Sequence, residues 1–345
     1  MRIMVTGACG FIGANFLYFL FGNNGVLDNA PELVVNFDKL TYAGNLDNVK
    51  ALSDKFADKK QYVFVHGDIA SKEQVEQTLK DYQIDTVINF AAESHVDRSI
   101  DDPTPFIQTN VLGTQVLLSA CLKFGIKRFV QVSTDEVYGS LGKDGLFTET
   151  TPLDPSSPYS ASKASADLLV LAFGRTYGLD VRITRCSNNY GPYQFPEKLI
   201  PLIFRKALAG EKLPVYGDGL NVRDWIYVED HCLGVLLTLV KGKAGGVYNF
   251  GGSAERSNIE VVKLILKELN QPESLITYVK DRPGHDRRYA MDWALAHKEL
   301  GYTPRWTFEK GIKATLDWYK KNTAWLESVE SGAYLEFMSK WYGER

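Results

Sequence analysis

Short runs of apolar residues, separated by longer amphipathic segments, dominate the first two thirds of the chain. The runs are almost continuously apolar, as expected for strands whose two faces are both covered by helices. Repeated strand and helix units of this kind predict a parallel, doubly wound sheet in an α/β protein. The predicted strands are Arg2–Thr6, Leu33–Phe37, Tyr62–His66, Thr86–Phe90, Arg128–Ser133 and Val181–Arg185, and the main helices are Phe11–Phe21, Lys72–Asp81, Phe106–Phe124 and Tyr159–Tyr177.

The pattern loosens after residue 190, where proline and glycine become frequent. We therefore predict a sheet domain over residues 1–190 and a smaller α/β substrate-binding lobe over residues 191–345, with residues 229–250 as a further unit that could return to the main sheet. The elements predicted here are the helices Leu199–Ala209, Glu229–Lys241, Asn258–Leu269 and Phe308–Asn322 and the strands Leu213–Tyr216, Val247–Phe250 and Thr277–Lys280.

The composition excludes several classes of protein. Of the 345 residues, 39 are Lys or Arg and 42 are Asp or Glu, and the resulting net charge of −3 argues against a nucleic-acid-binding surface. No apolar run approaches the ~20 residues that cross a bilayer. The first residues do not form a secretory signal, so we expect a cytoplasmic protein with no membrane partner.

The four cysteines lie at positions 9, 121, 186 and 232. Because they form no C-x-x-C pair and no histidines stand at zinc-ligand spacing, we predict no metal site. Reduced and mostly buried thiols are expected instead.

A glycine-rich loop follows the first predicted strand and opens the first helix. Its glycines permit a tight turn and a close approach of the backbone to a diphosphate, which then faces the helix N-terminus. This position predicts a Rossmann-type dinucleotide site. The residues expected to contact the dinucleotide are Gly7, Gly10, Phe11, Ile12 and Gly13.

The ends of the next strands supply further contacts for a dinucleotide. Asp38 ends the second strand, where a carboxylate can accept hydrogen bonds from a ribose diol and would repel the extra phosphate of NADP. Asp68 and Ile69 follow the third strand and could hold the adenine, although Asp68 could equally cap the next helix. Ala91 and Ala92 follow the fourth strand and are small enough to let a cofactor lie close. NAD is the expected cofactor.

Tyr159 and Lys163 are four residues apart at the start of a predicted helix, so their side chains share one face. A nearby ammonium group stabilises a tyrosinate and lowers the pKa of the phenol, which makes Tyr159 a candidate base. Together with the glycine loop and the acidic end of the second strand, this pair resembles the extended short-chain dehydrogenase/reductase family over nearly the whole chain.

The segment Thr134-Asp135-Glu136 narrows the resemblance, because it follows the fifth strand at the edge of the sheet where substrates bind. Two adjacent carboxyl groups there can take separate acid and base roles, provided that a turn lets them converge. The segment resembles the motif of the dTDP-glucose 4,6-dehydratase family, as do three longer runs. These runs are residues 38–45, 92–99 and 185–192.

The resemblance implies an internal redox sequence on a nucleotide sugar. Tyr159 takes the proton of the C4 hydroxyl while hydride passes from C4 to NAD, with Thr134 bonded to the C4 oxygen and Lys163 holding the ribose. Glu136 then removes the C5 proton, Asp135 protonates the departing C6 hydroxyl, and hydride returns to C6. The product is a 4-keto-6-deoxy sugar, and the cofactor stays bound.

The resemblance also implies further contact residues. Lys39, Leu40, Thr41, Thr109 and Asn189 are expected at the cofactor. The expected substrate contacts, besides Thr134, Asp135 and Glu136, are Ser94, Asp97, Asn188, Glu197, Lys198, Leu199, Pro214, Val215, Tyr216, Arg223, Asn258, Asp281, His285 and Tyr289. Arg223 is expected to clamp the diphosphate, because guanidinium binds phosphate oxygens in pairs.

Two helices, Phe106–Phe124 and Tyr159–Tyr177, carry apolar residues beyond one face. Pairing across a two-fold axis would bury them in a four-helix bundle, and the resemblance favours such a homodimer. Packing within one subunit is the alternative. The residues concerned include Leu112, Val116, Leu117, Leu168, Leu169 and Leu171.

Other functions remain open at this point. A UDP-glucose or CDP-glucose 4,6-dehydratase differs only in a few base contacts. A 4-epimerase needs neither Asp135 nor Glu136, whereas GDP-mannose dehydratases and UDP-glucuronate decarboxylases typically resemble Thr-Ser-Glu here. A regulatory protein that senses NAD is the non-enzyme alternative, since fold alone does not imply activity.

Overall fold

The structure, a computed structural model, describes residues 1–22, 25–56 and 58–329. The last part of the predicted C-terminal lobe, residues 330–345, therefore lies outside the described residues. In the described part of the chain, seven parallel strands form the main sheet in the order β10-β6-β5-β4-β1-β2-β3. These strands are β1 (Arg2–Thr6), β2 (Leu33–Asp38), β3 (Tyr62–His66), β4 (Thr86–Asn89), β5 (Arg128–Thr134), β6 (Val181–Cys186) and β10 (Val247–Phe250).

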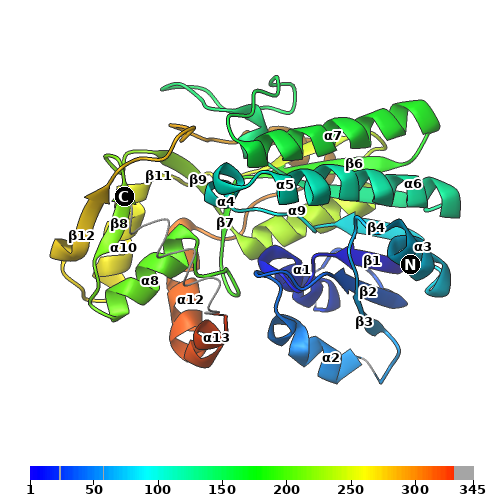
Figure 1. Cartoon of the computed structure of the whole chain (residues 1–345), viewed down its shortest axis with the longest axis horizontal. Coiled ribbons are helices and arrows are strands. Elements are labelled where there is room, and N and C mark those ends of the chain that lie inside the picture. Colours follow the sequence, from blue (N-terminus) through cyan, green and yellow to red (C-terminus); the bar gives the residue numbers. More distant parts are fainter. Residues whose placement is uncertain (23–24, 57, 330–345) are drawn as a thin grey trace.

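Helices cover both faces of this sheet (Figure 1). On one face, α1 (Phe11–Phe21) packs against α9 (Val228–Lys241) over a core of β1, β4 and β5 side chains. The other face carries α3 (Lys72–Asp81), α6 (Thr114–Phe124) and α7 (Pro158–Tyr177) over a second core. Because both faces are buried, the strands read as apolar runs, and the predicted Rossmann-type fold class is confirmed.

The direction in which successive strands are added to the sheet reverses between β1 and β4. The chain moves outward from β1 to β2 and β3 on one side, and from β4 to β5, β6 and β10 on the other. The loops that leave β1 and β4 therefore separate and open a crevice at the carboxyl ends of the strands, which is where α/β proteins bind ligands. The segment that includes α9 and β10 belongs to this sheet, although it follows parts of the C-terminal lobe in the sequence.

The C-terminal lobe lies beside the main sheet and its helices (Figure 1). It has its own hydrophobic core. Two small sheets, β11-β9-β7 and β12-β8, pack with the surrounding helices. Its strands are β7 (Asn188–Tyr190), β8 (Leu213–Tyr216), β9 (Val222–Tyr227), β11 (Glu255–Ser257) and β12 (Ile276–Val279), and its helices are α8 (Leu199–Leu208), α10 (Asn258–Glu268), η4 (Glu273–Leu275), α12 (Phe308–Lys321) and α13 (Thr323–Ser328). Helix α11 (Ala294–Leu300) packs instead against α9 and β10 of the sheet domain.

The helix predicted over Phe106–Phe124 differs in the structure. It consists of α5 (Thr104–Phe106), a π-helical turn η2 (Ile107–Gly113) and α6. In η2 the buried side chain of Asn110 donates to the Glu93 carbonyl and to Ser162 Oγ, and accepts from the Glu93 amide. The wider turn thus joins the loop after β4 to helix α7, which is a use typical of π-helical turns near functional sites.

Shorter elements complete the sheet domain. They are η1 (Leu46–Val49), α2 (Lys50–Phe56), α4 (Val96–Asp101) and η3 (Asp135–Tyr138). The apolar pattern does not predict them because each is seven residues or shorter. The four cysteines are free and buried, as predicted. No helix among the described residues could span a membrane, and no cluster of metal-binding side chains occurs there.

Candidate active site

The glycine loop after β1 forms the floor of the crevice. Gly7 has φ +67°, and its amide donates to Phe37 O at 3.0 Å. A Cβ on Gly13 would lie 2.5 Å from Gly7 O and 2.7 Å from Ala8 Cα. Only glycine permits this close packing of α1 on the loop, which leaves the N-terminus of α1 open toward the cavity.

Asp38 is held rigidly at the end of β2. Its Oδ2 accepts from the Cys9 amide and its Oδ1 from the Leu40 amide, each at 2.8 Å. Burial raises the pKa of this carboxyl group, and the two backbone hydrogen bonds oppose that shift. Asp38 is therefore fixed at the edge of the cavity, in the position expected for a ribose contact.

Asp68 does not cap the next helix. Ser71 is the N-cap of α3, whereas Asp68 forms an ion pair with Lys39 at 2.7 Å. The pair connects the ends of β2 and β3 at the side of the cavity.

Tyr159 lies in the first turn of α7, which begins at a fixed point. Ser157 and Ser160 form a capping box, and Pro158 occupies the first helical position. The backbone amide of Tyr159 donates to Ser99 Oγ at 3.2 Å. The Lys163 ammonium donates to Val132 O at 2.7 Å, so β5 also holds α7 in place.

The pKa of Tyr159 contradicts the sequence prediction. Burial raises it well above its ordinary value, and the charge of Glu136 adds to this, while a hydrogen bond with Thr134 opposes it. Burial also lowers the pKa of Lys163. The predicted lowering of the phenol pKa by Lys163 is therefore wrong for the chain alone, because burial of the phenol and the charge of Glu136 raise this pKa.

The turn that Asp135 and Glu136 require is η3. Thr134 caps it, since its Oγ1 accepts from the Glu136 amide at 3.2 Å and donates to Asp135 Oδ1 at 3.2 Å. Because the chain coils here instead of extending, both carboxyl groups line the same cavity as Tyr159 and Lys163.

The two carboxyl groups differ in their surroundings. Burial raises the pKa of Asp135 well above its ordinary value, and the charges of Glu136 and Asp224 raise it further. Burial also raises the pKa of Glu136, but Arg282, Lys198 and Arg223 oppose that shift. The environment thus favours the protonated form more strongly at Asp135 than at Glu136, which is the order that an acid and a base need.

One cavity brings most of the predicted site residues together. It contains all five predicted catalytic residues and every predicted cofactor contact except Leu40. The predicted substrate contacts that line it, besides those on η3, are Ser94, Asn188, Glu197 and Lys198.

The remaining predicted substrate contacts do not line this cavity. Val215 is buried in the core of the C-terminal lobe, and Leu199 packs against that core. Asp97 is buried in contacts with protein side chains. The others lie in the C-terminal lobe as well: Pro214, Tyr216, Arg223, Asn258, Asp281, His285 and Tyr289.

Sequence reasoning missed several residues of the site. Glu93, Cys186 and Ser187 line the cavity, and Arg282 is close enough to Glu136 to influence its pKa. Their positions in the sequence could have indicated them. Cys186 and Ser187 directly precede the predicted contact Asn188, and Arg282 lies between the predicted contacts Asp281 and His285.

Comparisons with known proteins match this geometry. A family model described as GDP-mannose 4,6 dehydratase matches residues 4–315. The chain is 53% identical to a dTDP-glucose 4,6-dehydratase of Xanthomonas campestris pv. campestris (strain B100), with 96% of each chain covered.

Two solved structures are similar to this chain over more than nine tenths of its length. The dTDP-glucose 4,6-dehydratase DesIV of Streptomyces venezuelae, with NAD and TYD bound, is 47% identical with a TM-score of 0.91, and the match covers 96% of this chain and 100% of that one. A UDP-glucose 4-epimerase of Thermotoga maritima with UDP-glucose is 30% identical with a TM-score of 0.84, over 94% and 100% of the two chains.

Proposed function

Because the chain belongs to the GDP-mannose 4,6 dehydratase family, we propose that it is a dTDP-glucose 4,6-dehydratase. The observation that carries this proposal is the convergence of Thr134, Asp135 and Glu136 with Tyr159 in one cavity. An epimerase has no use for an acid and a base beside the tyrosine, whereas elimination of water needs both. The identity to dTDP-glucose 4,6-dehydratases favours dTDP-glucose as substrate.

NAD fits the crevice. The glycine loop leaves no space for a side chain at Gly13, and two backbone amides fix the Asp38 carboxyl group, which would accept hydrogen bonds from a ribose diol. Gly10, Ile12, Ala91, Ala92 and Thr109 line the same cavity. NAD bound there would supply the hydride acceptor for the oxidation at sugar C4 and the hydride donor for the reduction at C6.

The side chains supply the proton transfers. Tyr159 takes the proton of the C4 hydroxyl as C4 becomes a ketone, and Thr134 bonds to the C4 oxygen. The ketone acidifies C5, and Glu136 takes that proton. Asp135 gives its proton to the C6 hydroxyl, which leaves as water. Glu136 returns its proton to C5 as C6 is reduced, which restores it as a base. Tyr159 then holds one proton more than at the start and Asp135 one fewer, so transfer of this proton from Tyr159 to Asp135 by way of solvent completes the cycle.

Incubating the purified chain, without added NAD, with dTDP-glucose, UDP-glucose, CDP-glucose and GDP-mannose in parallel tests this function. We expect mass spectrometry to show loss of one water from dTDP-glucose alone. Loss of water from another substrate would correct the base specificity. An unchanged mass with every substrate, even after NAD is added, would overturn the dehydratase proposal.

The pH dependence of the dehydration step follows from the two carboxyl groups, because Tyr159 has taken its proton before this step. Glu136 must be ionised, so the rate falls on the acid side as the pH drops through its raised pKa. Asp135 must be protonated, so the rate falls on the alkaline side as the pH rises through its more strongly raised pKa. We expect a bell-shaped profile when rapid-quench mass spectrometry follows the loss of water from the 4-keto sugar. A rate of water loss that keeps rising with pH above neutrality would contradict the acid role of Asp135.

A homodimer is the assembly that the surface favours. Ile107 and Leu112 on η2 and Leu168 on α7 are exposed, and η2 packs against α7. Leu117 is fully buried within the subunit, so it does not belong to the predicted bundle surface.

The free thiols fit a reducing compartment, and we place the enzyme in the cytoplasm.

Replacing Leu168 with Glu places a charge in this exposed apolar surface. We expect the variant to sediment as a monomer in analytical ultracentrifugation while the parent sediments as a dimer, because burying an unpaired charge is unfavourable. Leu208→Glu, an equally exposed position on α8, is the control and should leave the dimer intact. A Leu168→Glu variant that remains dimeric would contradict this interface.

A further inference from the structure

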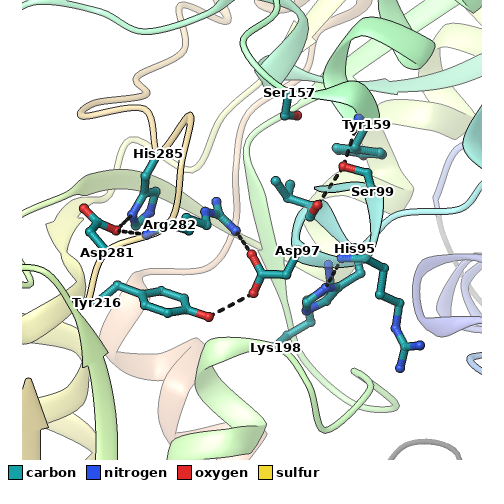
Figure 2. Close-up of polar contacts among 12 residues, drawn as sticks. His95, Asp97, Ser99, Ser157, Tyr159, Lys198, Tyr216, Asp281, Arg282 and His285 are labelled. Atoms are coloured by element: carbon teal, nitrogen blue, oxygen red, sulfur yellow. Dashed lines mark hydrogen bonds and ion pairs between the residues drawn. The ribbon is translucent and has the colours of Figure 1, made fainter. Parts of the chain in front are cut away.

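Asp97 lies in the first turn of α4 with 2% of its surface exposed. Both of its oxygens accept hydrogen bonds from the C-terminal lobe (Figure 2). Tyr216 Oη donates to Oδ2 at 3.0 Å, and Arg282 Nη1 donates to Oδ1 at 2.8 Å. A carboxylate of the sheet domain thus holds two side chains of the other lobe.

The two partners of Asp97 belong to one end of the β12-β8 sheet. Tyr216 ends β8, where it pairs with Val279 of β12, and Arg282 lies in the loop that follows β12. The same loop carries His285, which forms a 2.6 Å contact with Asp281 and packs its ring at the edge of Tyr216. Asp97 therefore fixes the loop whose Asp281 and His285 are predicted substrate contacts.

The opposite side of α4 reaches the catalytic helix. Ser99 follows Asp97 by two residues, and its Oγ accepts a hydrogen bond from the Tyr159 amide (Figure 2). Arg98, between them, forms an ion pair at 3.0 Å with Glu197 of the cavity. One short helix therefore links the β12-β8 sheet to the residue that begins the chemistry.

The charges around Asp97 favour an ion pair with Arg282 over a contact with the substrate. Burial by itself raises the pKa of Asp97, but Arg282 and His95 outweigh it, and the pKa lies below its ordinary value. Arg282 also acts on Glu136, together with Lys198 and Arg223. If Asp97 were removed, Arg282 would lose its carboxylate partner and would still lie close to the cations Lys198 and Arg223. An unpaired charge in such a place is unfavourable.

The sugar must reach Tyr159 and η3, so the predicted substrate contacts of the C-terminal lobe are left for the nucleotide portion. We propose that Asp97 is a positioning residue that holds Tyr216 and Arg282, and through them aligns this nucleotide-binding end of the site with Tyr159. The proposal replaces the expectation, taken from the resemblance, that Asp97 itself contacts the substrate. The identity of the nucleotide rests on the proposed function. Asp97 acts on binding of the nucleotide portion and leaves the chemical steps to the residues of η3 and α7.

The test compares two ligands of the holoenzyme, dTDP and dTDP-glucose. By isothermal titration calorimetry we expect Asp97→Asn to weaken dTDP about tenfold, within the range of typical couplings between sites. At saturating dTDP-glucose, and at the pH optimum of each variant because Arg282 also acts on Glu136, kcat should change by a smaller factor than the dTDP dissociation constant, while KM rises with that constant. Asp81→Asn, an exposed carboxylate on α3, is the matched control.

A double variant shows whether Asp97 acts through Arg282. If it does, adding Asp97→Asn to Arg282→Gln should weaken dTDP binding further by no more than the factor that Tyr216→Phe gives, because only the Tyr216 contact is then left to lose. Tyr216→Phe, which removes one hydrogen bond and little volume, should weaken dTDP by about two- to fivefold and serves if Asp97→Asn unfolds.

Three results are decisive. Unchanged dTDP affinity with weaker dTDP-glucose binding would make Asp97 a sugar ligand and overturn the proposal. Additive effects of Asp97→Asn and Arg282→Gln would also overturn it. If the parent binds UDP-glucose or another nucleotide sugar and not dTDP, the proposed function fails, and the same comparison with the nucleoside diphosphate that binds still decides the role of Asp97.

Discussion

Replacing Tyr159 with Phe is expected to lower kcat for dTDP-glucose by about 10²–10⁴-fold, the usual contribution of a positioned acid or base. The phenol is the group that takes the C4 proton, and Phe keeps the ring that packs against Phe106. Because oxidation at C4 is then blocked, no reduced nicotinamide should form. Rapid-mixing absorbance and product analysis measure both effects.

Tyr177→Phe, on the exposed end of the same helix, is the control for the loss of a phenolic oxygen and should retain full activity. Retained NAD, measured after denaturation of each protein, shows whether the cofactor site is intact. If Tyr159→Phe turns over within about threefold of the parent, Tyr159 is not the base.

Replacing Asp135 with Asn or Glu136 with Gln should stop the reaction one step later. Oxidation at C4 needs neither carboxyl group, so reduced nicotinamide and the 4-keto sugar should accumulate while product formation falls by about 10²–10⁴-fold. The expected signal is a burst of nicotinamide reduction without loss of water. Asp144→Asn, an exposed carboxylate, is the matched control.

Hydrogen exchange separates the two roles. In D2O, Asp135→Asn keeps the base, so C5 should still exchange its hydrogen with solvent. Glu136→Gln lacks the base, so C5 should not exchange. Equal exchange in the two variants would contradict the assignment of Glu136 as base and Asp135 as acid.

The sequence predicts the parts of the site that depend on local geometry. Gly7 and Gly13 follow a strand and open a helix, and Tyr159 and Lys163 share a helix face through their spacing. Each of these relations is complete within a few residues, so the pattern suffices to predict it. The fold class follows in the same way from the apolar runs.

The sequence does not predict contacts that depend on tertiary packing. Asp97 meets Arg282 across 185 positions and Tyr216 across 119, and no local pattern relates these residues. The π-helical turn at Asn110 likewise depends on partners in the loop after β4 and in α7. Burial of Tyr159 sets the direction of its pKa shift, and burial is known only once the helices have packed.

The most direct test of the account follows the hydrogen at C4. The purified chain, with no NAD added, is given dTDP-glucose deuterated at C4, and the product is examined by mass spectrometry and NMR. The account predicts loss of one water and deuterium at C6, because one retained NAD takes the hydride and returns it. Release of the deuterium to solvent, or an isomer of unchanged mass with deuterium still at C4, would contradict it.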